Sequence, residues 1–387
     1  MLSASCSNPK APSGGPAGGQ SAGGSQSAAD RQPAADRQSA GGPLTVKVGI
    51  IAALSGPAAS YGISINNGFK LAAEEINFGA DVKLTVLVED SAGSQEQALS
   101  AVKKLINSDS VSALLGPTLS TEMRVVGPEA NSNGVPILAT SNTAEGITGI
   151  GKYVLRDSMP ETIAIPAAIG QAVKRYGIKS VAILYGDDDV FTKSGFDTMK
   201  RTAESTGLKI TDVEKFQKGQ ADYNAQLTKI KSTNPDCVLC SALYNEGAVI
   251  IGQARKMGLT VPFIGGNGFN SPRVVEIAGG AANGLIVATP WFPLRQDRKV
   301  KDFITNYEKR FGQKPDQFSA QAYDGMYMLA EAIKKAGSAD RDKIRDSLAG
   351  IKNFDGVLGT FSFDENRDVS MAPYVLIVEN GQFRLFQ

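Results

Sequence analysis

Residue types that commonly do chemistry are sparse in this sequence. None of its 387 residues is a histidine, which removes the commonest general base, the histidine-dependent nucleophile pairs and the histidine-containing zinc sites. Cys237 and Cys240 form a C-x-x-C motif, but its context PDCVLCSAL is typical of a buried strand, on which this spacing puts the two side chains on opposite faces. Redox C-x-x-C motifs stand at helix N-termini, where the dipole lowers the thiol pKa. We predict two structural cysteines, and no catalytic residue, metal site or cofactor.

The loop LSGPAASYG (54–62) follows a buried stretch and precedes a predicted helix. A glycine-containing loop at such a place often binds phosphate through backbone N–H groups and the helix dipole. Nucleotide loops need G-x-x-x-x-G-K-[ST] or G-x-G-x-x-G, whereas here Pro57 follows Gly56, which removes a donor and fixes φ. The ligand is therefore predicted not to be a nucleotide.

The charge balance excludes a further class of partner. The chain has 40 Lys and Arg against 39 Asp and Glu, so it has no basic excess to neutralise a phosphate backbone, and we expect no nucleic acid partner. No apolar run approaches the length of a membrane span.

Residues 1–43 differ in composition from the rest of the chain. Residues 7–43 are rich in Gly, Ser, Ala, Gln and Pro and repeat AADRQ, so we predict a disordered linker with a reach of roughly 30–40 Å. The residues LSAS before Cys6 resemble the lipobox of bacterial lipoproteins, in which the cysteine is acylated. The usual apolar segment is missing, which would require a truncated signal peptide or a misassigned start. The alternative is a cysteine that occurs by chance in a low-complexity tail.

From residue 44 onward, strand-like runs alternate with helix-like ones. Apolar positions at helical spacing occur in 66–76 and 95–106. The strand-like runs fall into two series, namely 45–53, 82–90, 111–116 and 135–140, then 179–186, 208–216, 236–243, 261–266 and 284–290. This alternation predicts an α/β fold with two similar domains, each a parallel sheet covered by helices on both faces.

The C-terminal part is too poor in strands for a third domain. Residues 297–349 are predicted to be helical, and 357–386 to hold three short strands that complete the two existing sheets. The chain would then cross between domains near 155–159, 289–293 and 353–359. We predict an N-terminal lobe made of 44–156 plus 291–353 and a C-terminal lobe made of 157–290 plus 354–387.

The chain resembles the periplasmic binding proteins of the leucine/isoleucine/valine-binding type, the solute receptors of branched-chain amino-acid ABC importers. The resemblance covers about residues 47–386 in family order. It rests on LSGPAASYG (54–62), GFKLAAEEIN (68–77), ED (89–90), GPTLS (116–120), VPILATSNTA (135–144), YVLRDS (153–158), QARKMGL (253–259), AYDG (322–325) and FSFDENRD (361–368). It implies the type I fold, in which two lobes joined by a multi-strand hinge close over a ligand.

The resemblance also implies positions for the binding residues of the N-terminal lobe. Ser120 matches the place where a hydroxyl and helix N-terminal N–H groups meet a ligand carboxylate, with a plain helix cap as the alternative. Ser141 and Thr143 match positions that bind the ligand's polar head. Tyr61 matches the family's cleft tyrosine, and a packing role is the alternative.

In the C-terminal lobe, Phe191 matches a position where the family often has an aromatic residue, and Tyr244 or Leu243 lies near another cleft position. Asn267 occupies the place where amino-acid binders of the family have an acid that pairs with the ligand ammonium. Either the acid comes from elsewhere, with the aspartates 187–189 the nearest candidates unless they form a solvated loop, or the ligand has no ammonium group.

These inferences favour an extracytoplasmic solute receptor without catalysis, periplasmic or at the cell surface and anchored through Cys6. It would bind a small polar ligand, preferably an amino acid, and deliver it to an ABC transporter permease. The alternatives are a receptor for an ammonium-free carboxylate such as an aromatic acid, a ligand-sensing regulator on the same fold, and an enzyme, which the missing histidines disfavour.

Overall fold

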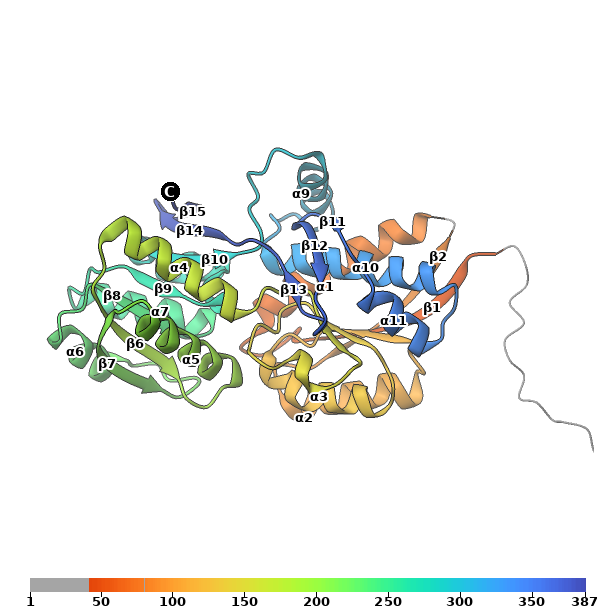
Figure 1. Ribbon diagram of the computed structural model, residues 1–387, viewed down its shortest axis with the longest axis horizontal. Coiled ribbons are helices and arrows are strands. Elements are labelled where there is room, and N and C mark those ends of the chain that lie inside the picture. The colour runs from red at the N-terminus through yellow and green to blue at the C-terminus, as the bar shows by residue number, and fades with distance from the viewer. Residues whose placement is uncertain (1–41, 80) are drawn as a thin grey trace, which may run out of the picture. The chain divides into compact units, whose positions relative to one another are not determined.

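The computed structural model describes residues 42–79 and 81–387 (Figure 1). Residues 42–387 form one compact unit. Cys6 and nearly all of the predicted linker lie outside the described residues. Within the described part, no helix is both long enough and apolar enough to cross a bilayer.

The first sheet is fully parallel, with the strand order β2-β1-β3-β4-β5. Its strands are β1 (Leu44–Ala52), β2 (Val82–Asp90), β3 (Ala113–Leu115), β4 (Ile137–Ala139) and β5 (Val154–Arg156). Successive side chains on a strand face opposite sides, so Ile50 and Ile51 of β1 belong to different buried clusters. Helices cover both faces of this sheet. On one side lie α1 (Ala59–Phe78) and α10 (Gln317–Ala336). On the other lie α2 (Gln95–Lys103), which continues into a π-helical turn (Lys104–Ser108), and α3 (Ser120–Ser132).

The second sheet has the order β15-β14-β10-β9-β8-β6-β7, in which β14 is Tyr374–Glu379 and β15 is Gln382–Leu385. Its parallel strands are β6 (Ser180–Gly186), β7 (Lys209–Phe216), β8 (Cys237–Ser241), β9 (Phe263–Gly265) and β10 (Leu285–Thr289). Helices α4 (Glu161–Tyr176) and α5 (Val190–Ser205) cover one face. The other face packs against α6 (Asn224–Ser232), α7 (Tyr244–Lys256) and α8 (Pro272–Ala278). We call these two sheets, each with its covering helices, the N-terminal and C-terminal lobes; their residue-level boundaries remain a prediction.

Cys237 and Cys240 behave as the sequence predicts. Both are fully buried on β8, and they belong to clusters on opposite faces of the second sheet. Burial raises the pKa of both thiols, so both cysteines are structural.

The C-terminal strands correct one expectation. The prediction that they only complete the two main sheets is wrong, because β11 (Phe354–Gly356), β12 (Gly359–Phe363) and β13 (Val369–Ser370) form a separate antiparallel sheet. Only β14 (Tyr374–Glu379) and β15 (Gln382–Leu385) extend a main sheet, antiparallel to β10. The small sheet is attached to α10 instead, since the Asp324 carboxylate accepts the N–H groups of Val357 and Leu358, both at 2.9 Å.

Residues 297–349 are mostly helical, as predicted, and divide into three helices, namely α9 (Arg298–Phe311), α10 and α11 (Arg341–Ala349). Their boundaries follow from local chemistry. Asp316 caps α10 by accepting the Ser319 N–H at 3.0 Å, and Gly337 ends it in the left-handed region at φ 59°. Such a conformation is almost free of strain for glycine alone. α10 packs against α1, which brings the C-terminal helices onto the N-terminal lobe (Figure 1).

Candidate ligand-binding site

A pocket lies between the two lobes. Parallel strands of both sheets end there, at the edge where open α/β sheets bind ligands. Its lining residues are Tyr61, Thr118, Leu119, Ser120, Ser141, Phe191, Leu243, Asn267, Gly268 and Phe318. As the lobes stand, the cavity is about 20 Å³, which leaves room for about one water molecule.

Five of the seven sequence-predicted binding residues line this pocket, and the other two lie directly behind it. Thr143 is buried and approaches Glu161, with 3.4 Å between the Thr143 hydroxyl and the Glu161 carboxylate. The backbone N–H of Tyr244 donates to the Tyr61 hydroxyl at 2.7 Å. The structure therefore brings all seven together, although their roles in binding remain a proposal.

The polar wall of the pocket comes from the N-terminal lobe and is bonded within that lobe. The Ser141 hydroxyl donates to the Thr118 carbonyl at 2.7 Å, and the Thr118 hydroxyl accepts the Ala53 N–H at 3.0 Å. The Ser120 hydroxyl accepts the Ala144 N–H at 3.3 Å. These bonds orient three hydroxyl groups without any contribution from the C-terminal lobe.

Ser120 is the first residue of α3, and the cap position before it belongs to Leu119. The alternative that Ser120 is a plain helix cap therefore does not hold. The first N–H groups of a helix have no intrahelical partner and favour anions. A hydroxyl beside these groups suits a ligand carboxylate.

Tyr61 lies on the first turn of α1, because the helix begins at Ala59, earlier than its apolar periodicity suggests. Gly62 makes this close approach possible, since a Cβ there would lie 2.0 Å from the Ala53 carbonyl oxygen. The Tyr61 hydroxyl donates to the Gly268 carbonyl at 2.5 Å and accepts the Tyr244 N–H at 2.7 Å. Burial is the main cause that raises the pKa of Tyr61 well above its usual value. This hydroxyl thus joins the N-terminal lobe to two loops of the C-terminal lobe.

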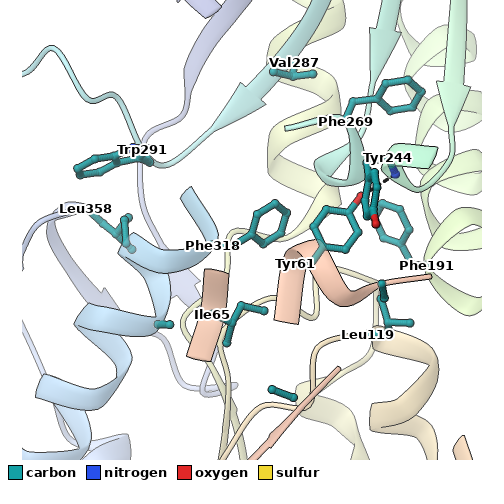
Figure 2. Packing of buried hydrophobic residues seen from close by; sticks show 14 of the residues in the cluster. Tyr61, Ile65, Leu119, Phe191, Tyr244, Phe269, Val287, Trp291, Phe318 and Leu358 are labelled. Atoms are coloured by element: carbon teal, nitrogen blue, oxygen red, sulfur yellow. Dashed lines mark hydrogen bonds between the residues drawn. The ribbon is translucent and has the colours of Figure 1, made fainter. Parts of the chain in front are cut away.

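Aromatic and aliphatic side chains form the rest of the pocket wall. Figure 2 shows Tyr61 between Phe318 of α10 and Tyr244 of α7, with Phe191 and Leu119 nearby. The ring centroids of Tyr61 lie 4.9 Å from Tyr244, edge to face, and 4.7 Å from Phe318. These contacts make one side of the pocket suitable for an apolar ligand group.

Further hydrogen bonds join the lobes beside the pocket. The Thr121 hydroxyl donates to the Asp189 carboxylate at 2.6 Å, and the Glu145 N–H donates to the Ser194 hydroxyl at 2.8 Å. The structure is therefore a closed form of the two lobes.

The three aspartates considered as a source of ligand-binding acid have other partners. Asp187 pairs with Lys215 at 2.8 Å, and Asp188 accepts the Lys218 N–H at 3.0 Å. Asp189 is buried and accepts two N–H groups at the start of α5. None of them lines the pocket.

Asn267 occupies the pocket edge, but its side chain is already engaged. Its side-chain oxygen accepts a hydrogen bond from the Gln317 amide, and Gln317 is bonded in turn to Asn270 and Thr289. The backbone N–H of Asn267 donates to the Glu161 carboxylate at 2.7 Å.

Sequence reasoning missed Glu161 and several lining residues. Glu161 is the first residue of α4 and fully buried, and burial is the largest cause that raises its pKa to about 7. An acid in a first helical turn is usually explained by the helix dipole, so no local signal distinguished it. Thr118, Leu119 and Phe318 were missed because pocket lining depends on which strand and helix ends meet.

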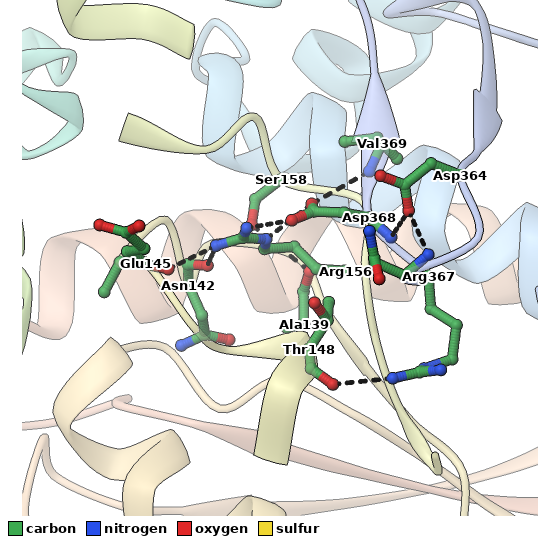
Figure 3. A network of polar contacts seen from close by, with 12 residues as sticks. Ala139, Asn142, Glu145, Thr148, Arg156, Ser158, Asp364, Arg367, Asp368 and Val369 are labelled. Atoms are coloured by element: carbon green, nitrogen blue, oxygen red, sulfur yellow. Dashed lines mark hydrogen bonds and ion pairs between the residues drawn. The ribbon is translucent and has the colours of Figure 1, made fainter. Parts of the chain in front are cut away.

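A buried arginine supports the loop that carries Thr143. The Arg156 guanidinium donates to the Asn142 and Ala144 carbonyls at 3.1 and 2.6 Å and pairs with the Asp368 carboxylate, with 2.9 Å from Nε to Oδ1 (Figure 3). Arg367 extends the network, because its guanidinium donates to the Thr148 carbonyl at 2.9 Å (Figure 3). The turn between β12 and β13 thereby supports the loop that carries Ser141 and Thr143 beside the pocket.

Comparison with known proteins gives consistent results. A family model described as periplasmic binding protein matches residues 45–382. A leucine-, isoleucine-, valine-, threonine-, and alanine-binding protein of Pseudomonas aeruginosa is 28% identical over 329 residues, covering 84% of this chain and 87% of that protein.

Two solved structures are similar throughout. The branched-chain amino acid transporter substrate binding protein LivJ from Streptococcus pneumoniae, in complex with isoleucine, has a TM-score of 0.82 at 28% identity, covering 88% of this chain and 97% of that one. A solute binding protein of an ABC transporter from Rhodopseudomonas palustris, in complex with 3,4-dihydroxy benzoic acid, has a TM-score of 0.80 at 26% identity, covering 88% and 95%. The predicted two-lobed α/β fold and the family resemblance are confirmed.

Proposed function

We infer that this chain, which belongs to the periplasmic binding protein family, is a solute receptor that binds a small carboxylate between its lobes and delivers it to an ABC importer. An amino acid is the favoured ligand. Because the family consists of binding proteins, the prediction that the chain is not an enzyme is confirmed.

One observation carries this proposal, which is the pairing of a hydroxyl-rich wall with an apolar wall around one small pocket. Ser120, Thr118 and the start of α3 offer donors for a carboxylate, since both hydroxyls only accept hydrogen bonds within the lobe. Phe191, Leu243 and Phe318 offer apolar surface for a side chain. The relatives named for branched-chain amino acids bind ligands with both features.

The binding mechanism follows from how the lobes are joined. The Tyr61 hydroxyl and the Thr121 hydroxyl both bond to the opposite lobe. A ligand that bridges the same two walls adds contacts in the closed form only, so it shifts the equilibrium toward closure. A permease that contacts both lobes would distinguish the closed form from the open one.

A second ligand class has a specific observation in its favour. None of the described residues that line the pocket is charged, and the R. palustris protein is in complex with an aromatic acid. An ammonium-free aromatic carboxylate could stack between Tyr61, Phe191 and Phe318.

A thermal-shift panel tests the function and separates the two classes. A ligand that binds only the folded protein raises the melting temperature in proportion to RT ln(1 + [L]/Kd). Amino acids, their deaminated analogues and aromatic acids would be compared at equal concentration. Shifts with branched-chain amino acids support the proposal, shifts with aromatic acids alone favour the second class, and the absence of any shift contradicts both.

We further propose that the protein works outside the cytoplasm and is anchored by an acylated Cys6. This residue lies outside the described residues, and the support is the lipobox-like LSAS that precedes it together with the family. Metabolic labelling with a fatty acid should mark the wild type and not Cys6→Ala. Equal labelling of both proteins, or labelling of neither, would count against the anchor.

A further inference from the structure

Glu161 is a buried carboxyl group without a cationic partner among the described residues. It is 0% exposed. Its pKa is raised by burial, and only the Asn267 N–H and the Thr143 hydroxyl act in the opposite direction. A carboxylate is rarely buried without a cation, because the loss of hydration costs several kcal/mol.

The position of this carboxyl group ties it to the candidate pocket. One oxygen, Oε1, accepts the Asn267 N–H at 2.7 Å and lies 3.4 Å from the Thr143 hydroxyl. Asn267 lines the pocket, and both residues belong to the set that the family resemblance assigns to the ligand's polar head. Glu161 therefore stands behind both loops that would surround that head.

The second oxygen of Glu161 is available. Oε2 is buried and has no hydrogen-bond partner among the described residues. It lies beside Gly266, where an added Cβ would be only 2.5 Å away. A larger residue at this position, directly before Asn267, would displace the carboxyl group.

The other buried acids near the cleft bond to neither of these two loops. Asp189 caps α5, Asp316 caps α10, and Glu122 accepts the Leu119 N–H at 2.7 Å. Within the described part of the chain, only Glu161 contacts both pocket loops and keeps an unpartnered oxygen.

We propose that Glu161 supplies the negative charge that selects ligands with an ammonium group. This inference rests on the proposed function and narrows it to amino acids. The family's amino-acid binders have an acid at the position of Asn267. Glu161, at the start of α4 and hydrogen-bonded to the Asn267 N–H, would provide that acid here. A ligand ammonium would compensate the burial of the carboxylate, and an ammonium-free acid would leave it uncompensated beside a second negative charge.

The test compares amino acids with their deaminated analogues on Glu161→Gln. Calorimetric titration would use two pairs, leucine with isocaproate and phenylalanine with hydrocinnamate. The substitution preserves size but removes the charge, so affinity for the amino acid that binds should fall about 10- to 100-fold, the range for a hydrogen bond to a charged group. Affinity for its deaminated analogue should stay equal or rise.

Glu122→Gln is the matched control. Glu122 is also buried at the start of a helix, and burial is the largest cause that raises its pKa to about 7, but its carboxylate bonds to Leu119 and to neither loop around the polar head. The ratio of amino-acid to analogue affinity should therefore remain that of the wild type. Loss of this discrimination in both variants would overturn the proposal.

The pH profile of the wild type provides a measurement that needs no variant. The neighbours of the Glu161 carboxyl, Thr143, Gly266 and Asn267, do not titrate, and no charged group among the described residues contributes to the shift of its pKa. An ammonium ligand binds the ionised carboxylate, so its affinity should rise as the pH increases from about 5.5 toward about 8. The affinity of the analogue should not rise, and Glu161→Gln should abolish the rise for the amino acid.

Contrary outcomes separate the inference from the proposed function. Equal weakening of amino acid and analogue by Glu161→Gln would mean that Glu161 only positions its two loops. If, in both pairs, the wild type bound the ammonium-free acid with the same affinity as the amino acid, the inference would be wrong and the receptor function would stand. Binding of none of the compounds in the panel would contradict both.

Discussion

The two walls of the pocket differ in whether their polar groups form hydrogen bonds within one lobe or only between the lobes. On the N-terminal wall, the hydroxyls of Thr118, Ser120 and Ser141 are bonded within their own lobe. On the C-terminal wall, the Gly268 carbonyl and the Tyr244 N–H are bonded to Tyr61 of the opposite lobe. The first wall is therefore complete in an open protein, whereas the second is completed only by closure.

This difference assigns different tasks to the lobes. A preorganised wall binds without the cost of ordering its side chains, so the ligand's carboxylate would meet the N-terminal lobe first. The C-terminal lobe then adds apolar contacts and makes the bonds that stabilise the closed form. Substitutions on the N-terminal wall should weaken the initial binding of the ligand, and those on the C-terminal wall should destabilise the closed form.

The largest effect is expected from a substitution that removes the support of the N-terminal wall. Asp368→Ala leaves the Arg156 guanidinium, which is 3% exposed, without its carboxylate partner, and should lower the free energy of unfolding by about 3 kcal/mol. Urea denaturation measures this loss. Asp355→Ala is the control, because its ion pair with Lys299 is exposed on both sides and should cost about 1 kcal/mol or less. Equal costs for both variants would contradict the supporting role of Arg156.

The next largest effect is expected from removing the hydroxyl that joins the N-terminal wall to the C-terminal wall. Tyr61→Phe removes the hydroxyl that joins the lobes and leaves the Gly268 carbonyl and the Tyr244 N–H unpaired in the closed form. Ligand affinity should fall by about 2–3 kcal/mol, as measured by calorimetry. Tyr223→Phe is the control, since the Tyr223 hydroxyl bonds to Gln220 within the C-terminal lobe and its loss should leave affinity unchanged. An unchanged affinity in Tyr61→Phe would show that closure does not depend on this hydroxyl.

The smallest effect is expected from removing a single hydrogen-bond donor of the N-terminal wall. Ser120→Ala should weaken binding by about 1–2 kcal/mol, the range for losing a hydrogen bond to a charged group. The melting temperature of the ligand-free protein should change little, because Leu119 holds the cap position and the Ser120 hydroxyl makes only one long bond, at 3.3 Å. A lower melting temperature with undiminished affinity would assign Ser120 a purely structural role.

Local sequence determined most of the secondary structure. The strand predicted at 82–90 coincides with β2, and the run at 179–186 differs from β6 by one residue. Apolar runs bounded by turn residues define such strands without help from distant parts of the chain. The family motifs likewise pointed to Ser120, Ser141 and Asn267, which line the pocket.

Tertiary structure decided how these elements pair and which side chains become buried. Whether β11–β13 join a main sheet depends on free sheet edges and on the anchoring of residues 357 and 358 to Asp324, which periodicity does not encode. Glu161 has the sequence signature of an ordinary acid in a first helical turn. Only folding places the loops of Thr143 and Asn267 over it, excludes water and raises its pKa to about 7, because desolvation depends on all the neighbours that the fold brings together.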